Sequence, residues 1–95
     1  NFIRQANYKQ FMAYKQLTKL IREKIQRKET IETKVLNLYE ASNPSFYYVY
    51  EILGDYYAAI QQTDTAITYW QKALTMPIPK QAEKVRIQQK INKKQ

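Results

Sequence analysis

Between residues 47 and 80, large and small side chains recur at spacings that place them on the facing sides of two helices. These positions are Tyr50, Leu53, Gly54, Tyr57, Ala66, Trp70 and Ala73. Because Gly54 and Ala66 carry little or no side chain, two antiparallel helices can approach closely there, and Tyr57 and Trp70 fill the space that remains. The spacing therefore predicts a tightly packed helical hairpin in the middle of the chain.

The composition favours helix throughout. The 95 residues include one Gly and three Pro, whereas a β-sheet domain of this size needs more turn residues. A chain of this length has room for one hydrophobic core. We therefore predict a single all-α domain over residues 1–95.

Apolar residues at spacings of three and four predict five helices, at residues 7–27, 31–41, 44–60, 63–76 and 79–93. The third helix is apolar on two faces and must be sandwiched between neighbours. The other helices each carry one stripe. The stripes are Ala13, Tyr14, Leu17, Leu20, Ile21 and Ile25 in the first helix, Ile31, Val35, Leu38 and Tyr39 in the second, Ala66, Ile67, Trp70, Ala73 and Leu74 in the fourth, and Ala82, Val85, Ile87 and Ile91 in the fifth.

Polar residues and prolines mark the expected helix starts. Thr30 is the expected N-cap of the second helix, and Asn43 followed by Pro44 is expected to open the third. Thr63 or Asp64 is expected to cap the fourth helix, and Pro79 to open the fifth.

The central spacing resembles a tetratricopeptide repeat (TPR), a helical hairpin of about 34 residues. The resemblance implies a right-handed stack of antiparallel hairpins: a degenerate hairpin at 7–41, a repeat at 44–76 and a capping helix at 79–93. Gln61 stands where the family usually has Gly at a left-handed turn, so this turn is expected either to be made by a residue with a side chain or to open slightly. Leu20, Glu32 and Tyr39 occupy close-packing positions of the degenerate hairpin, which is therefore expected to be splayed or shifted.

The charges and the missing residue types limit the chemistry. The sequence contains no Cys and no His, so thiolate nucleophiles, imidazole bases and Cys/His zinc sites are excluded. Residues 1–34 hold nine Lys or Arg and three Glu, and residues 71–95 hold seven Lys or Arg and one Glu. Residues 35–70, between them, hold four acidic residues and no Lys or Arg. We expect no catalytic residues, no cofactor, no metal site and no membrane span.

The resemblance also implies a binding strip, because the first helix of each TPR lines a concave face. The matching positions are Tyr48, Glu51, Asp55, Ala58 and Ala59. One aromatic ring beside two carboxylates suits a protein or peptide that carries Lys or Arg. The alternative is that the first or fifth helix covers this strip inside the domain.

These features predict a non-catalytic module for protein–protein interaction or oligomerisation, as part of a longer polypeptide. Its partner is a protein, a peptide, another domain of the same polypeptide or a second copy. A fainter resemblance, in Asn43–Pro44 and Leu53–Gly54–Asp55, is to helical extensions of bacterial penicillin-acylase-like amide hydrolases and implies an accessory domain. Nucleic-acid binding by the basic end helices is a weaker alternative, because the tyrosines and the basic residues do not interleave.

Overall fold

The computed structural model describes the backbone of residues 2–95 and the side chains of residues 11–95, and this part of the chain is all-α, with no strand. It contains five helices, as the sequence predicts. They are α1 (Phe2–Arg27), α2 (Thr33–Ser42), α3 (Tyr47–Ala59), α4 (Thr63–Leu74) and α5 (Gln81–Lys94).

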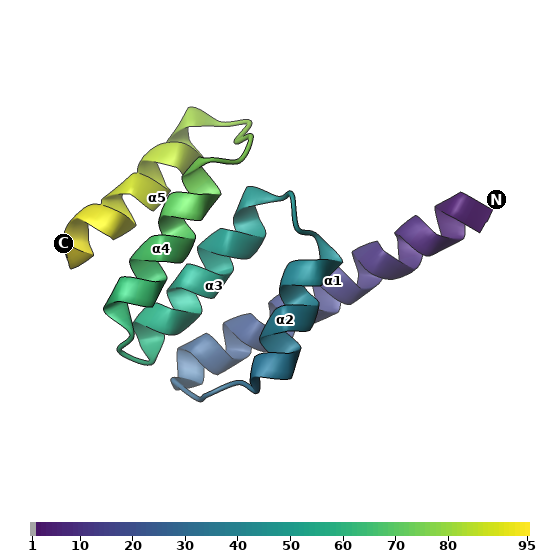
Figure 1. Ribbon diagram of the computed structural model, residues 1–95, viewed down its shortest axis with the longest axis horizontal. Coiled ribbons are helices and arrows are strands. Elements are labelled where there is room, and N and C mark those ends of the chain that lie inside the picture. The colour runs from purple at the N-terminus through teal and green to yellow at the C-terminus, as the bar shows by residue number, and fades with distance from the viewer. Residues whose placement is uncertain (1) are drawn as a thin grey trace.

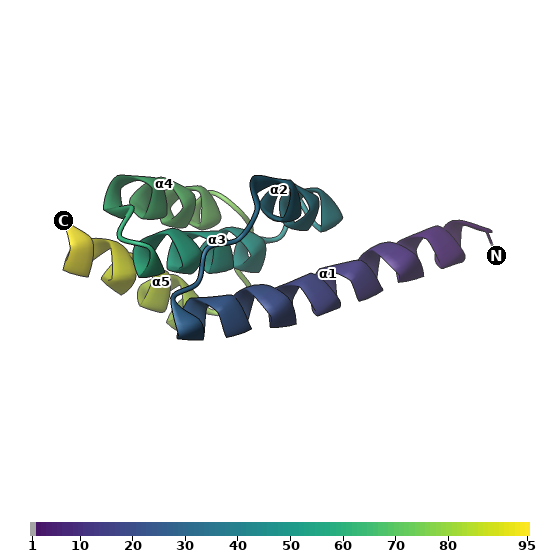
Figure 2. The ribbon, with the colours of Figure 1, turned by 90° about the horizontal axis from the view of Figure 1, so that it is seen from below.

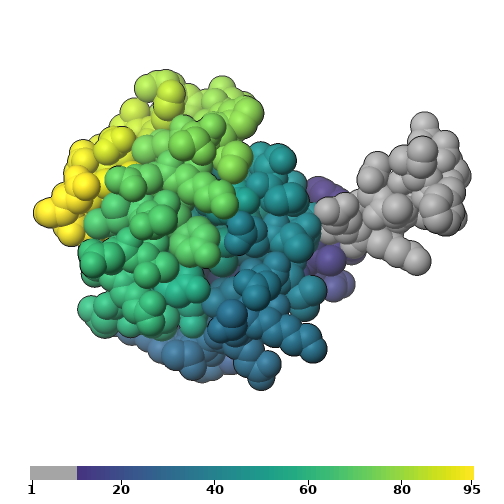
Figure 3. Space-filling view, in the orientation of Figure 1, coloured from purple at the N-terminus to yellow at the C-terminus, as the bar shows by residue number. Residues whose placement is uncertain are grey.

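The helices are arranged around α3. Figure 2 shows α2 and α4 on one side of α3, and α1 and α5 on the other. The space-filling view shows α2 and α4 side by side, forming most of one face (Figure 3). α3 packs against α1, α2 and α4, and α4 also packs against α5. α1 continues beyond the other helices at its N-terminal end (Figure 1).

The predicted sandwiching of the third helix is confirmed. Eight of the 13 residues of α3 are buried, and they lie on all of its sides: Tyr47, Val49, Tyr50, Glu51, Ile52, Leu53, Gly54 and Tyr56. The rest of the buried core comes from the faces that the other helices turn toward α3 and α4. Among the described side chains, α3 therefore contributes more buried residues than any other helix.

The close approach predicted at Gly54 is present in the α3–α4 hairpin. A Cβ atom built on Gly54 would lie 2.4 Å from the Trp70 ring, well inside van der Waals contact. Trp70 is buried, and its Nε1 donates to the carbonyl oxygen of Glu51 at 3.3 Å and to Oδ1 of Asp55 at 3.1 Å. Between α1 and α2, two stacked rings, Tyr14 and Tyr39, lie 5.8 Å apart.

The α3–α4 turn is left-handed, as expected from the position of Gln61. Gln61 has a φ of 68°, and Lys28, directly after α1, has a φ of 56°. Both are residues with side chains in a region that favours Gly. The backbone N–H groups of Gln61 and Gln62 bond to the carbonyls of Ala58 and Tyr57, which closes the end of α3.

The predicted caps were wrong, and so were the starts of α2, α3 and α5, whereas α4 begins at Thr63, where its predicted range begins. The N-cap positions of α2, α3, α4 and α5 are Glu32, Phe46, Gln62 and Lys80, and none of their side chains makes a capping hydrogen bond. Pro44 does not open α3: it lies in a turn, where its carbonyl accepts a 2.5 Å hydrogen bond from the Tyr50 hydroxyl. Tertiary contacts of the rings outweigh local capping preferences here.

Five residues of the predicted apolar stripes are exposed instead. Leu38 is 53% exposed, Leu20 40% and Val85 44%, and Ala13 and Ala82 are exposed too. In α2 the buried residues are Leu36 and Tyr39. α2 is therefore turned so that Leu38 faces outward.

Candidate binding groove

A groove of about 420 Å³ lies on the α1 and α5 side of α3. It is lined by Arg22 of α1, by Tyr48, Glu51, Ile52 and Asp55 of α3, and by Glu83, Arg86 and Lys90 of α5. Three residues of the predicted strip, Tyr48, Glu51 and Asp55, thus line one hollow. Ala58 and Ala59 are half-buried outside this lining, and Ala58 packs against the core.

The two carboxylates of the strip are held by cations from α5. Glu51 is 1% exposed. Arg86 forms a two-pronged contact with it, from Nη2 to Oε1 at 2.7 Å and from Nε to Oε2 at 2.8 Å. Nζ of Lys90 lies 2.8 Å from Oε2 of Glu51 and 2.9 Å from Oδ1 of Asp55. At Glu51 and Asp55, the fifth helix therefore covers the strip, as the alternative prediction stated.

The environment shifts the pKa values of the two carboxyl groups in opposite directions. Burial opposes ionisation of Glu51, but the hydrogen bonds from Arg86 and Lys90 outweigh it and hold the pKa of Glu51 below its usual value. Burial raises the pKa of Asp55, and the attraction of Lys90 offsets this only in part. Glu51 is therefore the more firmly ionised member of the pair.

Sequence reasoning missed the α5 side of this cluster, although a signal was present. Arg86 and Lys90 are four residues apart, as are Glu51 and Asp55, so each pair lies on one side of its helix. Two such pairs of opposite charge on neighbouring helices favour mutual ion pairing. The sequence left open that the fifth helix covers the strip, but it did not assign this role to Arg86 and Lys90.

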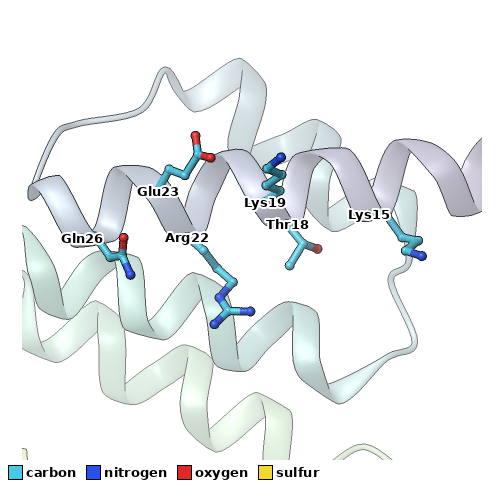
Figure 4. A pocket seen from close by; sticks show the side chains of 6 residues that line it. All are labelled: Lys15, Thr18, Lys19, Arg22, Glu23 and Gln26. Atoms are coloured by element: carbon cyan, nitrogen blue, oxygen red, sulfur yellow. The ribbon is translucent and has the colours of Figure 1, made fainter.

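The α1 wall of the groove carries basic side chains. A hollow along α1 that shares Arg22 with the groove is lined by Lys15, Thr18, Lys19, Arg22, Glu23 and Gln26. Figure 4 shows Arg22 and Gln26 extending on the side where α3 runs, with Glu23 pointing the other way. Within residues 11–95, no carboxylate lies at ion-pair distance from Arg22.

The remaining groove residues provide a ring and a third engaged carboxylate. The Tyr48 ring is half-buried and lies 6.4 Å from that of Phe46 and 6.3 Å from that of Tyr47. The Tyr47 hydroxyl donates to Glu83. Burial, followed by this bond to Glu83, raises the pKa of Tyr47 to about 12.

Comparisons with known proteins give no match: no protein-family model, no curated protein and no solved structure matches this chain. Across the described residues 2–95, no helix has the length and apolar character needed to cross a membrane.

Proposed function

We propose that this chain is a non-catalytic, TPR-type protein-interaction module whose α1–α3–α5 groove binds a peptide segment carrying acidic side chains. The observation that carries the proposal is the contrast between the carboxylates and Arg22. Glu51 and Asp55 are bound to α5 cations, whereas Arg22 faces the same groove with no described carboxylate partner.

The charge of the proposed partner is the reverse of the one that the sequence predicts. A partner bearing Lys or Arg would have to displace Arg86 from a buried carboxylate, and replacing one strong charge-assisted pair with another gives little net gain. An acidic partner leaves that pair intact. It meets Arg22 and, farther along α1, Lys15 and Lys19.

Packing features support the TPR-type assignment. Gly54 lies against the Trp70 ring, and Ala66 and Ala73 are fully buried in α4. Gln61 makes the left-handed turn where that family usually has Gly. These are the contacts that the resemblance implies for a closely packed repeat.

The non-catalytic part of the proposal rests on how the groove carboxylates are used. General acid–base work needs a carboxyl group that exchanges its proton near the working pH. The pKa of Glu51 is lowered, and its oxygens receive hydrogen bonds from Arg86 and Lys90. Burial raises the pKa of Asp55, but its oxygens accept hydrogen bonds from Lys90 and from Trp70. Glu83 accepts a hydrogen bond from the Tyr47 hydroxyl.

The test is peptide binding measured by fluorescence anisotropy. Two labelled peptides of equal length, one bearing Glu and one bearing Lys at the same positions, are titrated with the intact chain. We expect saturable binding of the Glu peptide, which Arg22→Glu weakens about tenfold or more because the charge at the contact is reversed. Tyr48→Ala is expected to weaken it as well.

Lys84→Glu is the matched control, because it makes the same charge change at an exposed residue of α5 outside the groove lining. Equal losses for Arg22→Glu and Lys84→Glu would mean that only net charge matters. Preference for the Lys peptide, or tighter binding of single-stranded DNA than of the Glu peptide, would overturn the proposal.

A further inference from the structure

A second groove, with an apolar lining, lies between α1 and α2. Its volume is about 600 Å³, and it is lined by Ala13, Gln16, Leu17, Leu20, Leu38, Ala41 and Ser42. None of these residues is charged, and none lines the α1–α3–α5 groove. The two grooves are therefore separate surfaces with different chemistry.

Two of the three leucines that line this groove are exposed. Leu38 and Leu20 are two of the four large apolar residues that are exposed within residues 11–95, and both line the α1–α2 groove. Exposed leucines that gather in one hollow are typical of an interaction site, whereas single ones are common on any surface.

Two positions of this groove have counterparts in the second hairpin that contact the α2 segment. The two hairpins match at a spacing of 34 residues, since Leu36 and Trp70 are both buried, and so are Tyr39 and Ala73. At the same spacing, Gln16 corresponds to Tyr50, and Leu38 corresponds to Lys72.

Tyr50 and Lys72 both contact the α2 segment. The Tyr50 hydroxyl donates to the carbonyl of Pro44, just after α2, at 2.5 Å. Nζ of Lys72 lies 3.3 Å from Oε2 of Glu40 in α2. At these two positions the second hairpin thus contacts the α2 segment, which places an acid beside Lys72. Leu17 and Leu20 correspond instead to Glu51, which α5 binds, and to Gly54, which lies against Trp70.

We infer that the α1–α2 groove binds an amphipathic α-helix of a partner protein, with an apolar stripe against Leu17, Leu20 and Leu38 and acidic residues toward one end. The charge of that end follows from the stripes that line the groove. Lys34 precedes Leu38 by four residues on α2, and on α1 Glu23 follows Leu20 by three and Arg27 follows it by seven. All three are exposed and lie toward the α1–α2 turn, so that end carries two cations and one acid.

A second copy of the chain fits this groove less well than an acidic helix. Each copy carries a net charge of +8, so two copies repel each other, most strongly at low ionic strength. An acidic partner helix is attracted to the end marked by Arg27 and Lys34. The partner is therefore another polypeptide segment, whose anchors are leucine-like residues at helical spacing.

The experiment uses two synthetic 18-residue helical peptides with the same leucine stripe, at positions i, i+3, i+4 and i+7. One carries Glu and the other Lys in the turn that flanks the stripe. Binding to the intact chain is measured by fluorescence anisotropy. We expect the Glu peptide to bind saturably, and at least tenfold more tightly than the Lys peptide.

Leu38→Glu is expected to weaken binding of the Glu peptide about tenfold or more. Val85→Glu is the matched control, because Val85 is exposed to a similar extent on α5 and lies outside the groove lining. Leu38→Glu is expected to leave binding of the Glu peptide without a leucine stripe unchanged, which separates the outcome from that of the acidic-peptide proposal. Circular dichroism checks that each variant keeps its helices.

Three results would overturn the inference. The first is no saturable binding of either peptide, and the second is equal loss in Leu38→Glu and Val85→Glu. The third is sedimentation velocity showing a dimer that Leu38→Glu dissociates, because the groove would then be filled by a second copy.

Discussion

At the scale of single residues, Glu51 contributes both to the charge of the groove and to the stability of the fold. Its carboxylate is almost fully enclosed, while Arg86, which binds it with two nitrogens, is 44% exposed at its side chain. Removing the acid leaves a cation that water can solvate. Removing the cation leaves a buried carboxylate with fewer hydrogen bonds, which costs more.

We therefore predict that Arg86→Met destabilises the fold more than Glu51→Gln. The expected losses in the free energy of unfolding are about 2–4 kcal/mol for Arg86→Met and about 1–2 kcal/mol for Glu51→Gln, measured by urea denaturation near pH 7. Lys84→Met is the control on α5, at an exposed residue without a described ion pair, and should change little. The reverse order would contradict the cluster as described.

The pH dependence of stability should distinguish the two carboxylates. Since the folded-state pKa of Glu51 lies below its ordinary value of 4.5, its stabilising contribution is present above that value and is lost as pH falls through the lowered pKa. The stability advantage of the wild type over Glu51→Gln should therefore shrink in acid. The pKa of Asp55 is raised, so the free energy of unfolding of the wild type should instead increase relative to that of Asp55→Asn as pH falls.

Urea denaturation from pH 7 to pH 3 measures both differences. Each variant serves as the other's control, because all remaining carboxyl groups are common to both. Parallel pH profiles for the two variants would show that the two groups do not have oppositely shifted pKa values.

Gly54 is the second residue with a sharp expectation. A methyl group there would lie 2.4 Å from the Trp70 ring, and the ring is itself buried and hydrogen-bonded. Gly54→Ala should therefore lower the free energy of unfolding by about 1–3 kcal/mol, despite the better helix propensity of Ala. Thermal denaturation followed by circular dichroism measures it.

The double variant Gly54→Ala with Trp70→Leu tests the cause. If the clash with the ring is responsible, the double variant should lose less stability than the sum of the two single losses, because the smaller side chain at position 70 makes room for the methyl group. Strict additivity would place the cost elsewhere.

At the scale of helices, periodicity and spacing predicted the five elements, because α-helices with one apolar face leave a clear pattern. The starts could not be predicted in the same way. Asn43 and Pro44 have good capping chemistry, yet α3 begins at Tyr47 because the Tyr50 hydroxyl and the ring of Phe46 fix the preceding segment through contacts outside the helix. Local preferences of about 1 kcal/mol are easily outweighed by such packing.

The α3–α4 turn gives a prediction at this scale. Gln61 adopts a φ of 68°, where a residue with a Cβ atom is strained by roughly 1 kcal/mol. Gln61→Gly should therefore leave stability unchanged or raise it by up to about 1 kcal/mol, since relief of strain exceeds the added flexibility of the unfolded chain.

Gln62→Gly is its control. Gln62 has a φ of −101°, which residues with side chains adopt freely, so Gly there should destabilise the turn. Chemical denaturation of both variants measures the contrast. A loss of stability in both would mean that the left-handed turn carries no strain.

At the scale of the whole molecule, the sequence predicted the position of the groove better than its charge. Tyr48, Glu51 and Asp55 share a face of α3 by spacing alone, and they do line one hollow. The ion pairs of Glu51 with Arg86 and Lys90 depend on how α5 lies relative to α3. The spacing of residues within one helix cannot predict that arrangement. The apolar groove was hidden for a similar reason: Leu38 fits a core stripe by period, but the rotation of α2 turns it outward.

The central claim is that an acidic segment binds between α1, α3 and α5. The most direct measurement is a two-dimensional ¹⁵N–¹H NMR titration of the intact chain with the Glu peptide. We predict saturable shifts concentrated in residues 15–26, 48–55 and 83–90. Shifts concentrated on α2 and α4, or no saturable shifts while the Lys peptide produces them in those three segments, would contradict it.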